Sequence, residues 1–268
     1  MNERNDPAII TESLSKAYGK TLAVDRLSIE VPAGSIFGLL GPNGAGKSTV
    51  IKMLTTLLPP SGGNAVVAGH SITGDPVGVR RSMGYVSQML SADGALTGYE
   101  NLLLFARIYG VPAKERKRRI MEALDFMGLS EVAGKVVGSY SGGMIRRLEI
   151  AQTILHHPSV VFLDEPTIGL DPVARRHVWE KLKELRDSYR TTIFLTTHDM
   201  EEADELCDLI AIMQSGRMAV TGAPQELKRL AGSDSMDEVF IHFAGETGEK
   251  TATYGEIVQT RRTAQRLG

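Results

Sequence analysis

One segment limits the possible folds of this chain more than any other. Residues 41–49 match the phosphate-binding loop pattern of two spaced glycines followed by a lysine and a hydroxyl residue. The apolar run at 35–40 predicts a buried strand before the loop, and the apolar spacing from Lys47 predicts a helix after it, ended by Pro59. Glycines let backbone N–H groups converge on phosphate oxygens, and a helix start adds a favourable dipole. A glycine-rich turn that binds nothing is the alternative, but the flanking strand and helix favour a phosphate site.

This loop predicts that the chain binds ATP together with Mg²⁺. We expect the Lys47 ammonium to neutralise the β- and γ-phosphates and the Ser48 hydroxyl to bind Mg²⁺. The predicted nucleotide-binding residues of the loop are Gly41, Pro42, Asn43, Gly44, Ala45, Gly46, Lys47, Ser48 and Thr49.

Two adjacent carboxylates follow a second apolar run, at residues 160–163. A buried strand of a parallel sheet would place Asp164 and Glu165 at the carboxyl edge, where ligands of such folds bind. Asp164 would then hold the Mg²⁺ shell, and Glu165 would orient or deprotonate the attacking water. By themselves two acids fit a solvated strand end. The phosphate-binding loop upstream favours the catalytic interpretation.

Ser141, Gly142 and Gly143 form a short glycine nest before a predicted helix at 145–156. This is a second anion site, and one triphosphate does not need two such sites in one chain. We therefore expect it to meet the γ-phosphate of ATP bound to another subunit. The alternative is a helix start capped by Ser141.

His198 comes directly after the predicted strand at 192–196. An imidazole at that strand end can reach a γ-phosphate oxygen and link it to Glu165. A structural histidine with satisfied hydrogen bonds is the alternative.

Composition narrows the class of protein. The 268 residues carry a formal net charge of −2, which gives no electrostatic footprint for nucleic acid. The single cysteine, Cys207, excludes an intrachain disulfide and suits a reducing compartment. Residues 1–7 do not resemble a secretory signal. No apolar run approaches the length of about 18 residues that a helix needs to cross a bilayer. Any membrane role is therefore expected to come through a partner.

The order of the patterns predicts an α/β fold. Turn-separated β-branched stretches over 8–31 indicate antiparallel strands, and helical patterns dominate 99–157. From residue 159 onward, apolar strands alternate with amphipathic helices, which favours a mostly parallel sheet with crossover helices. A hairpin is expected around residues 216–221, and the polar stretch 232–268 is expected to be a C-terminal extension of uncertain order.

With these motifs in this order, residues 8–230 resemble the ATPase domain of ABC transporters. The resemblance identifies 41–48 as Walker A, Asp164 and Glu165 as the end of Walker B, and 169–172 as the D-loop. Four further family motifs are matched. They are the Q-loop glutamine, which binds Mg²⁺ and takes part in catalysis, the switch histidine, the three signature residues that bind the γ-phosphate, and an aromatic ring stacked on adenine. In that order, the residues are Gln88, His198, Ser141, Gly142, Gly143 and Tyr18. Tyr18 also fits an ordinary turn tyrosine.

The resemblance completes the predicted architecture. It implies a P-loop NTPase core with an N-terminal antiparallel β-subdomain and flanking helices, in an ATPase domain over 1–231. A helical subdomain over roughly 89–157 would carry the signature. The predicted catalytic residues are Glu165, His198, Lys47 and Gln88, and the predicted metal-binding residues are Ser48, Gln88 and Asp164.

The signature departs from the usual L-S-G-G-Q, since Tyr140 and Met144 replace its first and last residues. The strings at 144–151 and 164–172, and the cluster at 236–240, resemble exporter ATPases of the daunorubicin-resistance and nodulation-factor group. The basic run at 114–119 fits a solvated helix face, with lipid headgroups or a partner as the alternative.

The resemblance implies an ATPase subunit that works in a homodimer or paired cassette and powers a separately encoded transmembrane permease, exporting drugs, lipids or glycoconjugates. It would lie in the cytoplasm on the inner face of the cell membrane, without nucleic acid. One alternative is a soluble mechanical ABC ATPase acting on nucleic acid or the ribosome, although no coiled-coil insertion, zinc module or second cassette is present. A small-molecule kinase or GTPase shares the phosphate loop but has no use for the signature.

Overall fold

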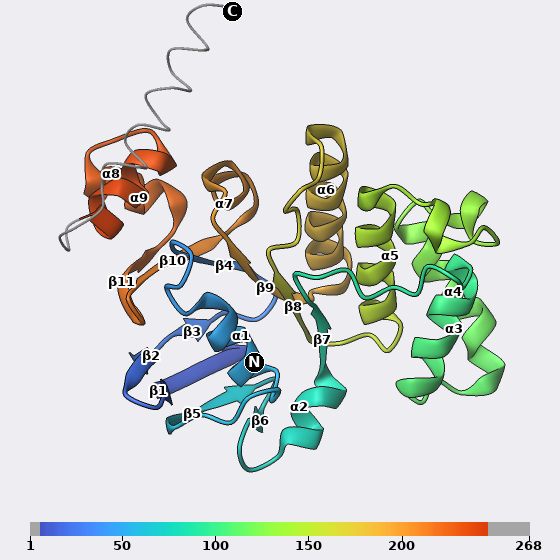
Figure 1. Ribbon diagram of the computed structural model, residues 1–268, viewed down its shortest axis with the longest axis horizontal. Coiled ribbons are helices and arrows are strands. Elements are labelled where there is room, and N and C mark those ends of the chain that lie inside the picture. Colours follow the sequence, from blue (N-terminus) through green and yellow to red (C-terminus); the bar gives the residue numbers. More distant parts are fainter. Residues whose placement is uncertain (1–5, 246–268) are drawn as a thin grey trace, which may run out of the picture.

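The computed structural model describes residues 6–245, which form two sheets with helices between and around them (Figure 1). The smaller sheet contains β1 (Ile9–Tyr18), β2 (Thr21–Leu27), β3 (Glu30–Val31), β5 (Gly62–Val67) and β6 (His70–Ser71). Its strands run in the order β2-β1-β5-β6, with β3 also paired to β1, and all these pairings are antiparallel. The predicted antiparallel β-subdomain is confirmed.

The larger sheet is six-stranded, in the order β11-β10-β4-β9-β8-β7. Its strands are β4 (Ile36–Leu40), β7 (Met83–Val86), β8 (Val160–Asp164), β9 (Thr192–Thr197), β10 (Leu209–Gln214) and β11 (Arg217–Gly222). Every neighbouring pair is parallel except β10 and β11, which form the expected hairpin. The predicted mostly parallel sheet is confirmed.

Side-chain alternation along the parallel strands divides the interior into two hydrophobic cores. In β4, Phe37 and Leu39 enter the core between the sheets, whereas Ile36 and Leu40 enter the core on the helical side. Strands β8, β9 and β10 alternate in the same way. Both faces of the sheet are buried, which explains why these strands are apolar without interruption.

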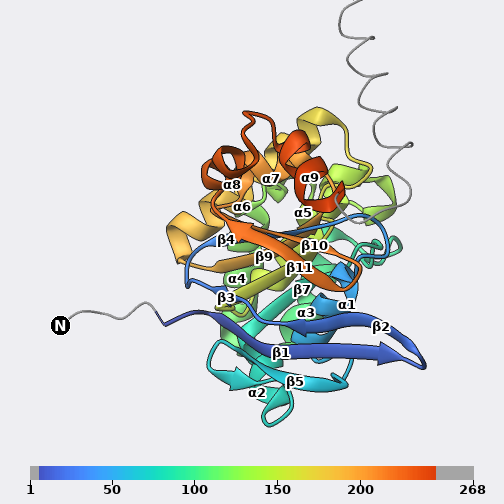
Figure 2. The same ribbon diagram turned by 90° about the vertical axis from the view of Figure 1, so that its left-hand side faces the viewer.

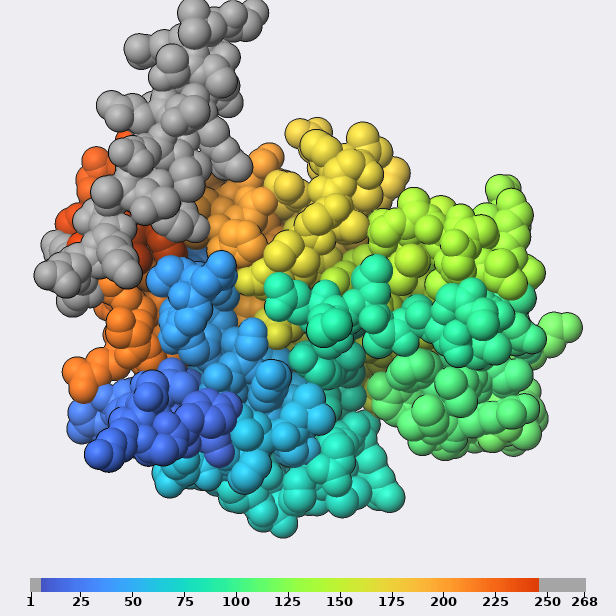
Figure 3. Space-filling view, viewed as in Figure 1, coloured from blue at the N-terminus to red at the C-terminus, as the bar shows by residue number. Residues whose placement is uncertain are grey.

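The helices fill three places around the central sheet. Figure 2 shows α1 (Lys47–Leu54) between the two sheets, with α6 (Pro172–Tyr189), α7 (Met200–Leu206), α8 (Pro224–Ala231) and α9 (Met236–Gly245) on the other side of the central sheet. Three further helices, α3 (Gly98–Ile108), α4 (Ala113–Phe126) and α5 (Gly142–Ile154), form a lobe beside the sheets (Figure 3). Helix α2 (Pro76–Ser82) lies near β6 and β7. Within residues 6–245, no helix is both long and apolar enough to cross a membrane.

The prediction that the helix after the phosphate loop continues to Pro59 is wrong. Helix α1 ends at Leu54, and Thr56 adopts a left-handed backbone with φ of 62°. The Thr55 hydroxyl donates to the Ile51 carbonyl at 2.8 Å, and Leu57 is 61% exposed rather than on the buried face. A residue with a left-handed backbone cannot continue a right-handed helix, and when that residue is not glycine the sequence gives no sign of it.

The first part of the predicted C-terminal extension is folded. Met236, Val239 and Phe240 of α9 are buried in the helical-side core, and Gln214 donates to the Ala244 carbonyl at 2.5 Å. Helix α9 therefore belongs to the main body of the chain. Residues 246–268 lie outside the described part, as do residues 1–5.

Candidate nucleotide site

The carboxyl ends of four adjacent parallel strands, β4, β9, β8 and β7, form one edge of the central sheet. The chain leaves these strands into the phosphate loop, His198, Glu165 and Gln88, respectively. The sheet order therefore brings together side chains that are widely separated in the sequence, at the edge where open α/β sheets bind ligands.

Close backbone packing explains two glycines of the phosphate loop. A Cβ atom on Gly41 would lie 2.4 Å from the carbonyl oxygen of Met213. A Cβ atom on Gly46 would lie 2.4 Å from the carbonyl oxygen of Ala23, and Gly46 also has φ of 109°. The smaller sheet and the β10–β11 hairpin thus press directly on the loop, and only glycine fits at these contacts.

Lys47 is the buried cation of the site, with 5% of its surface exposed. Its Nζ donates to the carbonyl oxygen of Gly41 at 2.8 Å and lies 3.8 Å from Glu165 Oε1. Burial lowers the pKa of the Lys47 ammonium, and the carboxylates of Glu165 and Asp164 oppose that shift. A phosphate group at this loop would favour the charged ammonium further.

Ser48, Asp164 and Thr196 form a short chain of hydrogen bonds beside the loop. The Ser48 hydroxyl donates to Asp164 Oδ1 at 3.2 Å, and the Thr196 hydroxyl donates to the same oxygen at 2.5 Å. These hard oxygen atoms are the donors that Mg²⁺ prefers. Residues 6–245 contain no cluster of three or more His, Cys, Asp or Glu side chains that could hold a metal ion. A nucleotide-bound Mg²⁺ does not need one, because phosphates and water supply most of its ligands.

Glu165 lies at the centre of the predicted catalytic residues. Its carboxylate is 3.2 Å from His198 Nδ1 at one oxygen and accepts from Gln88 Nε2 at 3.4 Å at the other. Glu165 is 8% exposed, and its backbone has φ of 51°, a left-handed conformation that is costly for glutamate. The structure therefore brings Glu165, His198, Gln88 and Lys47 together, as the sequence predicted.

Thr196 is a site residue that the sequence analysis missed. Besides its bond to Asp164, its hydroxyl accepts from the Glu165 backbone N–H at 3.1 Å, and it is fully buried. It therefore touches both members of the acidic pair. The available signal was its register, since β9 places Thr196 directly beside Asp164 of β8. That register requires the strand order, which one sequence does not give.

The signature residues do not join this cluster. Ser141 caps α5 by accepting from the Met144 backbone N–H at 3.3 Å, and its contact with the ATP of another subunit stays a prediction. Ser141 and Gly142 are exposed, whereas a Cβ atom on Gly143 would lie 2.6 Å from the Ala174 Cβ atom of α6. Figure 1 shows α5 well away from α1, with β8, β9 and α6 between them. The exposed helix start is free to contact a ligand of another molecule.

Tyr18, the predicted adenine-stacking residue, ends β1 at the tight turn into β2. Its side chain is 50% exposed, and the Lys16 ammonium lies 5.6 Å from the centre of its ring. An exposed ring of this kind can stack on a base or can be an ordinary turn residue. Its role stays a prediction.

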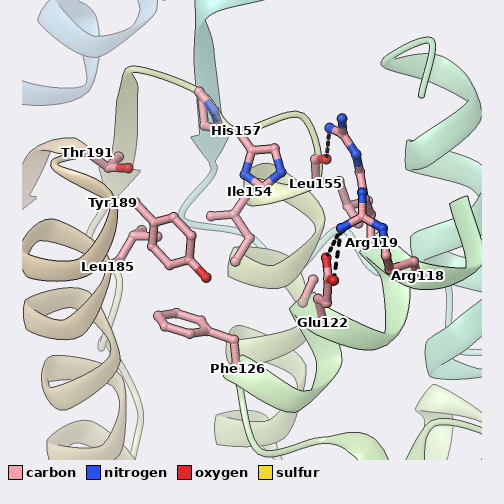
Figure 4. Close-up of a pocket in the computed structure, with 12 residues that line it drawn as sticks. Arg118, Arg119, Glu122, Phe126, Ile154, Leu155, His157, Leu185, Tyr189 and Thr191 are labelled. Atoms are coloured by element: carbon pink, nitrogen blue, oxygen red, sulfur yellow. Dashed lines mark hydrogen bonds and ion pairs between the residues drawn. The ribbon is translucent and has the colours of Figure 1, made fainter. Parts of the chain in front are cut away.

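A separate hollow of about 370 Å³ lies among α4, α5 and α6, away from the strand ends of the nucleotide site (Figure 4). Its lining includes Arg118 and Arg119 from the basic run and the aromatic side chains of Phe126 and Tyr189. Arg118 donates to Glu122 and Arg119 to Glu115, at distances of 2.8–3.0 Å. These arginines are paired along the helix, as on an ordinary charged helix face.

Comparisons with known proteins identify relatives of this chain. A family profile described as ABC transporter matches residues 24–168, and a profile described as an AAA domain, putative AbiEii toxin of a type IV toxin–antitoxin system, matches the shorter segment 136–204. The daunorubicin/doxorubicin resistance ATP-binding protein DrrA of Streptomyces peucetius is 47% identical over 234 residues, which cover 87% of this chain and 71% of that protein. The Nod factor export ATP-binding protein I of Sinorhizobium fredii is 41% identical over 257 residues, covering 96% and 74%.

A solved structure shows the same fold. That of cbiO1 from Clostridium perfringens, described as part of an ABC transporter complex, has a TM-score of 0.77 and 28% identity, covering 84% of this chain and 91% of the other.

Thr196 provides a test of the site. Thr196→Val keeps the side-chain volume but removes the hydroxyl that contacts Asp164 and Glu165. We expect the kcat for ATP hydrolysis to fall about 10–100-fold and the Mg²⁺ concentration for half-maximal rate to rise, as is typical when a partner of a metal ligand is lost. Thr196→Ser retains the hydroxyl and should stay near the wild-type rate. If the Val and Ser variants had equal rates and equal Mg²⁺ requirements, the Thr196 hydroxyl would have no role in hydrolysis.

Proposed function

Because this chain belongs to the ABC transporter family, we propose that it is the ATP-hydrolysing subunit of an exporter, working in a pair of cassettes and powering a separately encoded membrane subunit. As a family member the chain is an ABC-type ATPase. The observation that carries the proposal is the convergence of His198, Gln88 and Lys47 on the carboxylate of Glu165.

Each of these side chains has a distinct task in the proposed reaction. The Lys47 ammonium and the backbone N–H groups of its loop bind the phosphates and offset their charge. Glu165 accepts the hydrogen bond of the attacking water and orients or deprotonates it. His198, which lies between the end of β9 and Glu165, is placed to hold the γ-phosphate and Glu165 in line. Thr196 holds the Glu165 backbone. His198, Gln88 and Lys47 surround the carboxylate itself, and these contacts limit its movement.

Ser48 and Asp164 are the residues that would hold Mg²⁺, with Gln88 nearby through its contact with Glu165. When bound, this ion neutralises charge that develops on the β- and γ-phosphates. The hydrogen bond from Thr196 fixes the orientation of the Asp164 carboxylate in advance, so that less conformational entropy is lost when the ion and nucleotide bind.

The second half of the site comes from another cassette in this proposal. Ser141 and Gly142 are exposed at the start of α5, and Leu170 of the D-loop segment lies against Gly142. Ile168 and Val173 on either side of this segment are 43% and 64% exposed. An exposed surface of helix-start N–H groups with apolar neighbours suits a contact with the ATP of a second molecule. Closing the pair excludes water and completes the polar surround of the phosphates, and loss of the γ-phosphate lets it open.

Exposed apolar side chains after Gln88 and on α3 suit a contact with the membrane subunit. Met89 and Leu90 are 80% and 52% exposed, and Leu104 and Ile108 of α3 are 46% and 66% exposed. Large apolar side chains exposed to this extent favour a protein contact. The partner would place this chain on the cytoplasmic face of the membrane. The direction of transport and the cargo class, a drug, lipid or glycoconjugate, rest on the relatives named for daunorubicin resistance and Nod factor export.

The alternative of a soluble mechanical ATPase is disfavoured by these relatives and by the net charge of −2. Detergent extraction of the native complex distinguishes the two. We expect a tagged chain to retain a multi-spanning membrane protein, and Met89→Glu with Leu90→Glu to lose it while keeping ATP affinity, because charges replace the apolar contact. Retention of nucleic acid or ribosomes instead, with no membrane protein, would overturn the transport function.

Glu165→Gln tests the catalytic assignment. Glutamine keeps the size of the side chain but cannot accept a proton, so ATP affinity should stay within about 2-fold while kcat falls at least about 100-fold, within the range of general-base catalysis. Hydrolysis measured by phosphate release and affinity measured by equilibrium dialysis separate the two effects. Glu180→Gln on the exposed face of α6 is the matched control and should hydrolyse at the wild-type rate. A Glu165→Gln enzyme with the wild-type rate would exclude Glu165 as the catalytic base.

Gly142→Asp tests the shared site. A Cβ atom at this position meets only an ordinary 3.7 Å contact with Leu170, so folding should be preserved. The added carboxylate would oppose the phosphates of the partner's ATP, and we expect kcat to fall about 100-fold with ATP affinity nearly unchanged. Gly142→Ala is the neutral control. If binding and turnover fell together in the Asp variant, the signature would serve folding rather than catalysis.

A further inference from the structure

Helix α5 carries a buried ion pair that the proposed reaction does not use. Arg146 and Glu149 are each 2% exposed, and Arg146 Nη1 lies 3.0 Å from Glu149 Oε2. Burying two ions is costly, and an apolar pair of similar size is often at least as stable. The other contacts of the two side chains show what the pair holds.

Arg146 holds the start of the segment 87–92, which we name the Gln88 loop. Its guanidinium donates to the Ser87 carbonyl at 2.7 Å and to the carbonyl of Gln88 itself at 2.9 Å. Burial lowers the pKa of Arg146, while Glu149 and then Asp164 act in the opposite direction. The planar guanidinium suits such a task because it contacts two carbonyls and a carboxylate at once.

Glu149 holds the other end of the same loop. One carboxylate oxygen accepts from the Ser91 backbone N–H, from the Ser91 hydroxyl at 3.1 Å and from the Ala92 backbone N–H at 3.3 Å. Just beyond, Asn101 of α3, 1% exposed, donates to the Asp93 carbonyl at 2.9 Å and accepts from the Asp93 N–H at 3.0 Å. The Gln88 loop is therefore fastened to the helical lobe at both ends.

The same loop touches the catalytic carboxylate through the bond from Gln88 Nε2 to Glu165. The helix that fastens it begins with Ser141 and Gly142, the residues proposed to meet the ATP of a second cassette. Arg146 and Glu149 thus connect the Gln88 loop firmly to α5 and its exposed start, and the single 3.4 Å contact from Gln88 Nε2 links this unit to Glu165.

We infer that Arg146 and Glu149 couple the two nucleotide sites of the cassette pair, by making the Gln88 loop and the signature helix move as one body. This inference rests on the proposed function. A nucleotide that displaces Gln88 in one site would then reposition the helix start that completes the other. Without the Arg146–Glu149 ion pair, the phosphate loop of each cassette should still bind ATP, but ATP bound at one site should no longer affect the other.

The decisive variant is Arg146→Met combined with Glu149→Gln. It removes both charges together, so no unpaired ion is left buried, and the introduced amide oxygen can still accept from Ser91 and Ala92. In steady-state hydrolysis by the full chain, we expect kcat to fall at least 10-fold and the Hill coefficient for ATP to fall from above 1 to 1. ATP affinity by equilibrium dialysis should change less than 2-fold. A purely structural ion pair would instead lower thermal stability and leave the Hill coefficient unchanged.

Arg147→Met is the matched control. Arg147 is the neighbouring guanidinium of α5 and also donates to a backbone carbonyl, that of Met127 at 2.9 Å, but it makes this bond to the end of α4. It should keep both kcat and the Hill coefficient. Arg146→Lys retains the cation opposite Glu149 but not the fork that spans two carbonyls, so it should give an intermediate kcat and Hill coefficient.

The outcomes separate this inference from the proposed function. A cooperative wild type whose double variant keeps both kcat and Hill coefficient overturns the coupling role and leaves the paired ATPase intact. A wild type that is fully active as a monomer, with a Hill coefficient of 1, overturns both. If the double variant does not bind ATP, Arg146→Lys decides: wild-type values overturn the inference, and a reduced Hill coefficient with retained ATP affinity supports it.

Discussion

The parallel pairing of β4, β9, β8 and β7 is the constraint on which the whole site depends. Parallel strands end at a common edge, so four loops from distant parts of the sequence must meet there. The pairing is maintained because both faces of these strands are buried, and a shift of one residue would send every apolar side chain into the opposite core. The burial of Phe37 and Leu39 on one side and of Ile36 and Leu40 on the other therefore fixes the positions of Lys47 and Glu165. Stability and site geometry have the same physical origin here.

Much of the fold and most of the site were predictable from sequence because their signals are local. The phosphate loop, the strand before Asp164 and the alternation after residue 159 each combine a motif with its context. The missed features depend on partners far away in the chain. Strand β6 has only two residues and β5 is partly exposed, so neither sequence has the apolar run of a central strand. Thr196 and Asn101 look like ordinary polar residues until the register of β9 and the path of the Gln88 loop are known.

Buried polar side chains outside the phosphate loop hold the loops that must keep a fixed geometry. Glu202, 1% exposed, accepts from the Thr167 hydroxyl at 2.7 Å and from the Trp179 indole N–H at 2.9 Å. Burial raises the pKa of Glu202, and the hydrogen bonds from Thr197, Thr167 and Trp179 oppose that effect. Thr167 follows Glu165 by two residues and Thr197 precedes His198, so this one carboxyl connects the two loops that bring Glu165 and His198 to 3.2 Å. A buried carboxyl with several donors is costly to form but leaves few alternative arrangements.

The buried groups also show where the molecule is built to be rigid and where it meets others. Arg146, Glu149 and Asn101 join the Gln88 loop to the helical lobe, whereas Gln88 makes a single 3.4 Å contact across to Glu165. The strong connections thus lie within the lobe, and the weaker one crosses from the lobe to the sheet. A rotation of the lobe would break the fewest favourable contacts at that crossing point, beside the γ-phosphate position proposed above. The exposed Met89 and Leu90 lie within the same loop, so a membrane partner that holds them would act on the lobe without disturbing the buried sheet.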